Sequence, residues 1–169
     1  MNDITLADIA APFETTAISV RPEWIDYNGH MNIAFYIMAF DLAFDGLYKI
    51  LGLDSATVEK TGISTFSVEK HITYQQEVHK GDRLRIATQL LGFDAKRAHY
   101  IQLMYNADEG YLAATDEWLI LCVDLKSRKV TNWPEHTLKA FEKILAVHSK
   151  LPLPPEVGRK IDLKAKRPR

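Results

Sequence analysis

The chain has few of the features that mark secreted, membrane-spanning or nucleic-acid-binding proteins. Cys122 is its single cysteine, so no disulfide can form within the chain, and its place in an apolar run favours a buried structural thiol. A formal net charge of −1 gives no electrostatic reason to expect nucleic acid or an anionic membrane as a partner. Asp41 and Asp45 interrupt the longest apolar stretch, which argues against a membrane-spanning helix.

Several local signatures are missing as well. The first five residues show neither the basic start nor the apolar stretch of a signal peptide, so a cytoplasmic protein is expected. No metal-ligand spacing, phosphate-binding glycine loop or nucleophile elbow is present, so we expect neither a metal nor a cofactor. The length predicts one domain over residues 14–150, between an N-terminal arm (1–13) and a Pro-rich, basic tail (151–169).

A long helix is the strongest predicted element. Alternation over residues 14–22 predicts a strand before it. Residues 33–51 are apolar on nearly every side, which predicts a helix wrapped by other structure. Gly52 is a suitable C-terminal stop, and Gly46 inside the helix suggests close packing at that point.

Four strand-like runs follow the helix, separated by three turns at near-regular intervals, which favours an antiparallel meander. They span residues 66–78, 84–93, 97–106 and 111–124. In the first run, apolar residues from Phe66 to Tyr74 share one face, and Glu69 and His71 share the other. The last two runs are apolar on both faces, so one face can cover the helix and a partner subunit is the preferred cover for the other. An amphipathic helix is expected from Pro134 to about residue 149.

The most informative feature is the segment 24–32, directly before the long helix. It places Asp26, Asn28, Gly29 and His30 within five residues. At a helix N-terminus, unpaired backbone N–H groups and the positive end of the helix dipole stabilise negative charge. Acid–base groups in that position suit an enzyme that forms an oxyanion.

These elements together resemble the hotdog fold, an α+β architecture in which an antiparallel sheet wraps a long central helix. The motif Asp26-Tyr27-Asn28-Gly29-His30-Met31-Asn32, with Tyr36 one turn into the helix, resembles acyl-CoA thioesterases of the 4-hydroxybenzoyl-CoA thioesterase type. The resemblance spans about residues 14–125. The segments 66–72, 81–82 and 88–99 more narrowly resemble the thioesterases associated with carnitine dehydrogenase, which act on betainyl-CoA.

The resemblance implies roles for the motif residues, each with a plainer alternative. Asp26 would act as nucleophile or as the base for water, and otherwise would cap the helix or order the loop. His30 would orient or polarise the reacting groups, or share the water with Asp26, or be a structural histidine bonded to the backbone. Asn28 would hold the carboxylate or the substrate carbonyl, or be a turn residue. The main-chain N–H of Ile33 would stabilise the oxyanion, and Gly29 would serve the turn or let the backbone approach the ligand.

Other residues would bind the acyl-CoA substrate. They are Tyr36, Glu69, His71, Trp118, Lys96 and Arg97. Glu69 and His71 would line the site or a subunit contact, unless they form an exposed strand face. Lys96 and Arg97 would meet coenzyme A phosphates, unless they are merely solvated. Asp41 is the reserve catalytic carboxylate.

A betaine acyl group offers no hydrogen bonds, so aromatic faces and a carboxylate should recognise its quaternary ammonium. The candidates are Trp24, Tyr27, Tyr36, Tyr74 and Trp118, with Asp45 or Glu69 nearby, although such aromatic residues also serve as core packing.

Two other functions remain open beside hydrolysis of a small acyl-CoA by a homodimer or homotetramer. The first is a hotdog-fold enoyl-CoA hydratase or dehydratase. One large group of these enzymes has proline where Gly29 lies and histidine five residues after the aspartate, whereas His30 follows Asp26 by four. The second is a non-catalytic acyl-CoA binding module, which would bind coenzyme A without turnover.

Overall fold

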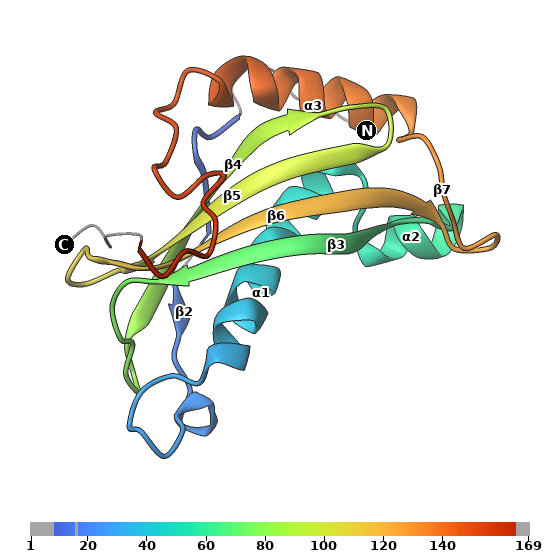
Figure 1. The fold of residues 1–169 in the computed structure, drawn as a ribbon. Helices are drawn as coiled ribbons and strands as arrows, with labels where there is room; N and C mark the ends of the chain where they lie inside the picture. The colour runs from blue at the N-terminus through green and yellow to red at the C-terminus, as the bar shows by residue number, and fades with distance from the viewer. Residues whose placement is uncertain (1–8, 16, 165–169) are drawn as a thin grey trace.

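The long helix α1 (Ile33–Leu51) is the centre of the computed structural model, which describes residues 9–15 and 17–164 (Figure 1). It begins where the Asn32 side chain accepts a hydrogen bond from the Ala34 N–H at 3.0 Å. It ends at Gly52, whose φ of 66° is the left-handed conformation that glycine adopts without strain. The predicted helix and its stop are confirmed. A Cβ at Gly46 would lie 2.9 Å from the Phe13 ring, so the close packing expected there is confirmed too.

A seven-stranded antiparallel sheet curves around α1 (Figure 1). Its strands are β1 (Phe13–Glu14), β2 (Ile18–Ser19), β3 (Ile63–Tyr74), β4 (Arg83–Phe93), β5 (Arg97–Asn106), β6 (Leu112–Asp124) and β7 (Lys129–Val130). The order is β1-β4-β5-β6-β3, with β2 also on β4 and β7 on β6. Among the described residues, the strand predicted over 14–22 is two short strands, β1 and β2, and a 3-10 helix replaces its end at Pro22–Trp24, where the proline fixes φ.

The predicted four-strand meander is correct for β4, β5 and β6 and wrong for β3. That strand pairs with β6 at the far edge instead of with β4. The turn predicted at residues 79–82 is confirmed, with the Asp82 N–H donating to the His79 carbonyl at 3.1 Å, but the segment 75–82 crosses the end of the sheet instead of joining two paired strands. On the way it meets the loop before α1, where the Met31 N–H donates to the Val78 carbonyl at 2.8 Å.

Strand β3 carries a bulge that changes which side chains share a face. Its register with β6 shifts between Ser67 and Glu69, leaving Val68 as the extra residue. Phe66 and Ile72 are six positions apart on β3, but their partners on β6, Leu121 and Asp116, are five positions apart. The side chains of Phe66 and Ile72 therefore lie on opposite faces of the sheet. The prediction that Phe66 shares a face with Ile72 is wrong for this reason.

Helix α1 buries one side against the sheet and leaves apolar residues on its other side. The exposed ones are Ile33, Ile37, Met38 and Leu42, at 39–63% exposure. The composition of the helix predicted that other structure wraps it on every side, but this chain alone covers only one side of it. Helix α2 (Ser55–Thr61) was not predicted, while α3 (Glu135–His148) confirms the last predicted helix, with Pro134 as its N-cap. Within the described ranges, no helix is long and apolar enough to cross a membrane.

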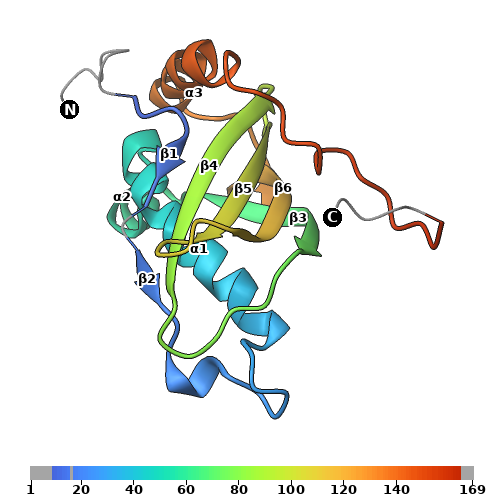
Figure 2. The same ribbon diagram turned by 90° about the vertical axis from the view of Figure 1, so that its left-hand side faces the viewer.

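The outer face of the sheet is covered in part by the segment after α3. Figure 2 shows this segment descending along the outside of the sheet. There the Gly158 N–H donates to Glu117 Oε2 at 2.8 Å, and Glu156 is 6% exposed. Part of the cover that we assigned to a partner subunit thus comes from the chain itself.

Candidate active site at the start of helix α1

The motif residues form one tight loop between the 3-10 helix and α1 (Figure 1). The Asp26 N–H donates to the His30 carbonyl at 3.1 Å, and the Gly29 N–H donates to the Asp26 carbonyl at 3.0 Å. Gly29 has a φ of 84° with open space where a Cβ would lie. The turn itself thus requires glycine at this position, because L side chains rarely adopt that φ. The loop holds Asp26 beside the first turn of the helix.

Two donors fix the half-buried Asp26 carboxylate. The backbone N–H of Asn28 donates to Oδ1 at 2.8 Å, and the Asn32 side-chain amide donates to Oδ2 at 3.3 Å. Asn28 thus acts through its backbone while its side chain is exposed. The side-chain role considered for Asn28 belongs to Asn32, which sequence reasoning missed. An asparagine immediately before the helix was the available signal, because that residue is favoured as an N-cap.

The first amide of α1 is available for an oxyanion. The Asn32 side chain takes up the Ala34 N–H, and the Asn32 carbonyl accepts from the Phe35 N–H at 3.0 Å. Among the described residues, the Ile33 N–H is left without such a partner, as expected for the first residue of a helix. His30 donates from Nδ1 to the Met31 carbonyl at 3.3 Å, so in this tautomer Nε2 is the hydrogen-bond acceptor of the ring.

Aromatic residues pack around this loop. Tyr36, in the first turn of α1, is buried and meets Tyr74 of β3 edge-to-face with ring centroids 5.1 Å apart. Burial raises the pKa of Tyr36 to about 12, so it remains a neutral phenol. Trp24 stacks on Phe35, and Tyr27 at the loop tip is 97% exposed.

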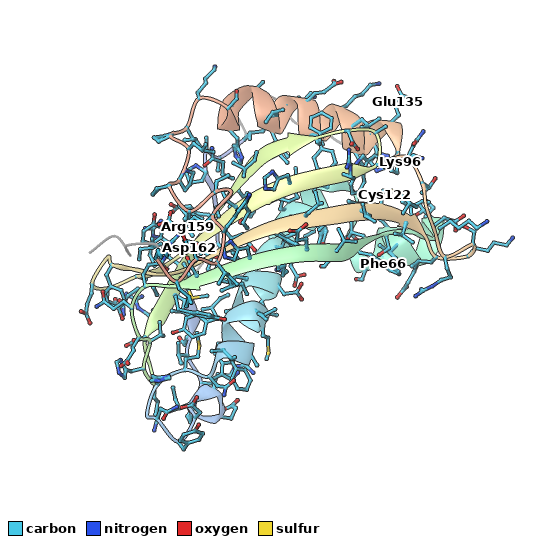
Figure 3. All side chains as sticks on the ribbon, viewed as in Figure 1. Phe66, Lys96, Cys122, Glu135, Arg159 and Asp162 are labelled. Atoms are coloured by element: carbon cyan, nitrogen blue, oxygen red, sulfur yellow. The ribbon has the colours of Figure 1, made fainter. Side chains whose placement is uncertain are left out.

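The other predicted substrate-binding residues lie in two groups. Glu69 and His71, on the outer face, line a groove of about 650 Å³ beside residues 158–161 together with Trp118, whose ring packs on Phe44 of α1. Lys96 lies in the β4–β5 turn, at the opposite end of the sheet from the motif loop (Figures 1 and 3), and Arg97, the first residue of β5, binds Asp94 at 2.6 Å. One chain therefore does not bring these residues to Asp26, and their roles stay predictions.

The arrangement suits the hydrolysis of an activated ester. A fixed carboxylate lies beside a helix N-terminus, where an exposed amide and the helix dipole favour negative charge on a nearby oxygen. A long helix wrapped by an antiparallel sheet, with this acid-bearing loop at its start, defines a hotdog-fold thioesterase.

Comparisons with known proteins agree. Residues 20–141 match the family model of the thioesterase-like superfamily, and the chain belongs to that superfamily. Over 158 residues it is 37% identical to the betainyl-CoA thioesterase of Pseudomonas aeruginosa, covering 94% of this chain and 98% of that protein. It is 35% identical over 157 residues to an L-carnitine dehydrogenase/betainyl-CoA thioesterase of Rhizobium meliloti, covering 93% of this chain and 32% of the longer protein.

Solved structures show the same fold. A Staphylococcus aureus protein in complex with CoA superposes with a TM-score of 0.85 at 24% identity, over 96% of this chain and 99% of that one. A Pseudomonas putida KT2440 protein described as a thioesterase candidate gives 0.75 at 31% identity, over 93% and 98%. The predicted hotdog fold is confirmed, and so is the predicted activity class: the chain is an acyl-CoA thioesterase.

Proposed function

We propose that the chain hydrolyses a small acyl-CoA thioester and that betainyl-CoA is its substrate. The observation that carries the chemistry is the Asp26 carboxylate, held by two donors beside the free amide of Ile33. The acyl group is supported by the relatives, because the Pseudomonas aeruginosa protein, which matches nearly end to end, is named a betainyl-CoA thioesterase.

Two routes share this geometry. Asp26 either attacks the thioester carbonyl and forms an anhydride that water then opens, or it takes a proton from the water that attacks directly. In both routes the carbonyl oxygen becomes an oxyanion, which the Ile33 N–H and the helix dipole stabilise, and the sulfur leaves as the coenzyme A thiolate. Loss of one such donor typically costs about 10²–10³ in rate. The proposed reaction uses no metal and no redox cofactor.

The proposed enzyme is a homo-oligomer. Exposed apolar residues of α1 lie beside β3, whose Val68 and Tyr74 are also 50% and 41% exposed. Strand β3 is an edge strand of 12 residues with β6 on one side only. An open edge next to an apolar helix face favours association with a second copy. Light scattering should therefore give a mass of two or four chains, and a monomer would contradict this part of the proposal.

Release of free coenzyme A tests the activity. Wild type and Asp26→Asn should be compared on betainyl, short aliphatic, long-chain and aromatic thioesters, with Asp41→Asn as the matched carboxylate control. We expect betainyl-CoA to be preferred, and Asp26→Asn to lose at least about 10²-fold in kcat, because only the charged carboxylate attacks or takes a proton. Asp41→Asn should keep most activity.

Other outcomes identify the rivals. Loss of activity in Asp41→Asn but not in Asp26→Asn would transfer the chemistry to α1. Hydration of crotonyl-CoA without coenzyme A release would indicate a hydratase. Saturable coenzyme A binding without turnover would indicate a binding module.

A further inference from the structure

A lysine ammonium occupies a built cation site between the sheet and α1. Lys70 Nζ lies 2.5 Å from Asp116 Oδ2 and 4.0 Å from the ring centroid of Trp118. The Asp116 side chain is fully buried, while the Lys70 side chain is 19% exposed. A carboxylate together with the face of an indole is the combination that binds alkylammonium ions. This site is thus built for a positive charge, and its present occupant reaches the surface.

The same region holds several buried polar atoms without partners. Four such atoms occur in the described part of the chain, namely Tyr100 Oη, Gln102 Oε1, Asp116 Oδ1 and Trp118 Nε1. Their residues form a compact block, because Tyr100 is paired with Trp118 and Gln102 with Asp116 across β5 and β6. A buried polar atom left unpaired costs about 1–3 kcal/mol, and this sheet leaves such atoms unpaired at four adjoining positions. Such a block is expected where a ligand or ordered water completes the site.

The other cation–aromatic contacts of the described residues differ. Arg21 on Trp24, Arg85 on Tyr105 and Arg128 on Phe66 are the other three. Of their cations, Arg85 also meets a carboxylate, but that of Glu14, whose side chain is 45% exposed. Among these four contacts, only that of Lys70 with Trp118 also includes a fully buried carboxylate, Asp116, one of whose oxygens has no hydrogen-bond partner.

We propose that Asp116 and Trp118 form the subsite for a cationic acyl group, and that Lys70 occupies it while it is empty. This inference rests on the proposed function and assigns residues to the recognition of its substrate. The quaternary ammonium takes the place of Lys70 Nζ against the carboxylate and the indole. Lys70 then turns away from the carboxylate into solvent, which its 19% exposed side chain already reaches.

The location of this subsite determines which Asp26 serves it. Gln102 Nε2 donates to the Phe40 carbonyl at 3.2 Å, and the Phe44 ring lies 4.7 Å from Trp118. These two helix residues are about 10 and 16 Å along α1 from its first residue. The nitrogen of betaine is two bonds from its carbonyl carbon, or about 2.5 Å. The Asp26 that serves a thioester bound here, by either route, therefore belongs to a second copy of the chain.

Charge discrimination tests the subsite. The cationic substrate betainyl-CoA is compared with 3,3-dimethylbutyryl-CoA, its neutral isostere, in wild type and in Asp116→Asn. We expect the kcat/KM ratio of the two substrates to fall at least about tenfold in the variant, because the isostere keeps every contact except those that depend on charge. Turnover of the isostere shows that the variant folds. Glu117→Gln, on the next residue but the opposite face, is the matched control and should keep the wild-type ratio.

The results separate this inference from the proposed function. If wild type does not hydrolyse betainyl-CoA, the proposed function fails. If wild type prefers betainyl-CoA and Asp116→Asn keeps that preference, the subsite is wrong and the proposed function stands. Lys70→Met should keep the cationic preference. The inference is overturned if wild type hydrolyses succinyl-CoA and Lys70→Met does not, because Lys70 would then bind an anionic acyl group.

Hybrid oligomers test the shared site. One chain carries Asp26→Asn and the other Asp116→Asn, each with its own purification tag. If the two residues act across the interface, both defects fall in one site and the other site is intact, so the hybrid should hydrolyse betainyl-CoA at about half the wild-type rate. If they act within one chain, every site has a defect and the hybrid should be no faster than Asp116→Asn alone.

Discussion

The Asn32 side chain makes two hydrogen bonds with separable roles, so its variants should distinguish an effect on the free energy of unfolding from an effect on catalysis. Its side-chain oxygen caps α1 by accepting from the Ala34 N–H at 3.0 Å, and its amide donates to Asp26 at 3.3 Å. Asn32→Ala removes both, whereas Asn32→Ser keeps an oxygen for the cap and loses the amide donor. Loss of the cap costs about 1 kcal/mol in the free energy of unfolding, which is a fall in Tm of about 2–4 °C for a chain of this size.

Catalysis should follow the other hydrogen bond. A bond to a charged group contributes about 1.5 kcal/mol, so both variants should lose about tenfold in kcat for the preferred acyl-CoA. Only Asn32→Ala should also lose stability, measured by urea unfolding and thermal melting. Asn28→Ala keeps the backbone donor to Asp26 and should lose less activity than Asn32→Ser. Wild-type turnover in a stable Asn32→Ser would refute the claim that Asn32 orients the catalytic carboxylate.

Three further outcomes follow from the fold. Gly52→Ala should lower the free energy of unfolding by about 1 kcal/mol with unchanged kcat, because φ is 66° there. Burial raises the pKa of the Cys122 thiol to about 11, so a thiol reagent should modify it only after unfolding. Burial lowers the pKa of His148, whose Nδ1 accepts from the Leu90 N–H and whose Nε2 donates to the Ala10 carbonyl. Stability should therefore fall as the pH drops below about 6.5, because only the unfolded histidine takes up a proton there; His148→Gln should flatten that slope.

Local signals made α1 and its loop predictable. The helix runs from Ile33 to Leu51 as predicted, because an asparagine cap precedes it and a glycine in the left-handed region follows it. The carboxylate and the amide donor also lie within a few residues of one another, so the motif could be recognised as a unit. What the pattern could not show is which asparagine holds Asp26, because that depends on the loop closing between Asp26 and His30.

Pairing between distant segments accounts for what was missed. The place of β3 beside β6, and the bulge at Val68 that inverts its faces, depend on contacts about 50 residues apart along the chain and leave no local mark. Lys70 illustrates the same limit. A lone lysine in a predicted strand is expected to be solvated, yet its carboxylate partner is 46 residues away. Only the register of β3 on β6 brings Lys70 over Trp118.

The cation site under α1 should be costly for the folded state, and that cost can be measured. A buried ion pair can be replaced by apolar residues with a neutral or stabilising effect of about 1–4 kcal/mol, and Asp116 Oδ1 is unpaired besides. The double variant Lys70→Met, Asp116→Leu should therefore unfold at equal or higher urea concentration than wild type while losing its preference for betainyl-CoA over the neutral isostere. A single Asp116→Leu leaves Lys70 without its partner and should be the less stable protein. If the double variant were instead strongly destabilised, the pair would be explained by folding, and recognition of a cationic acyl group would not be needed to account for a buried charge beneath the helix.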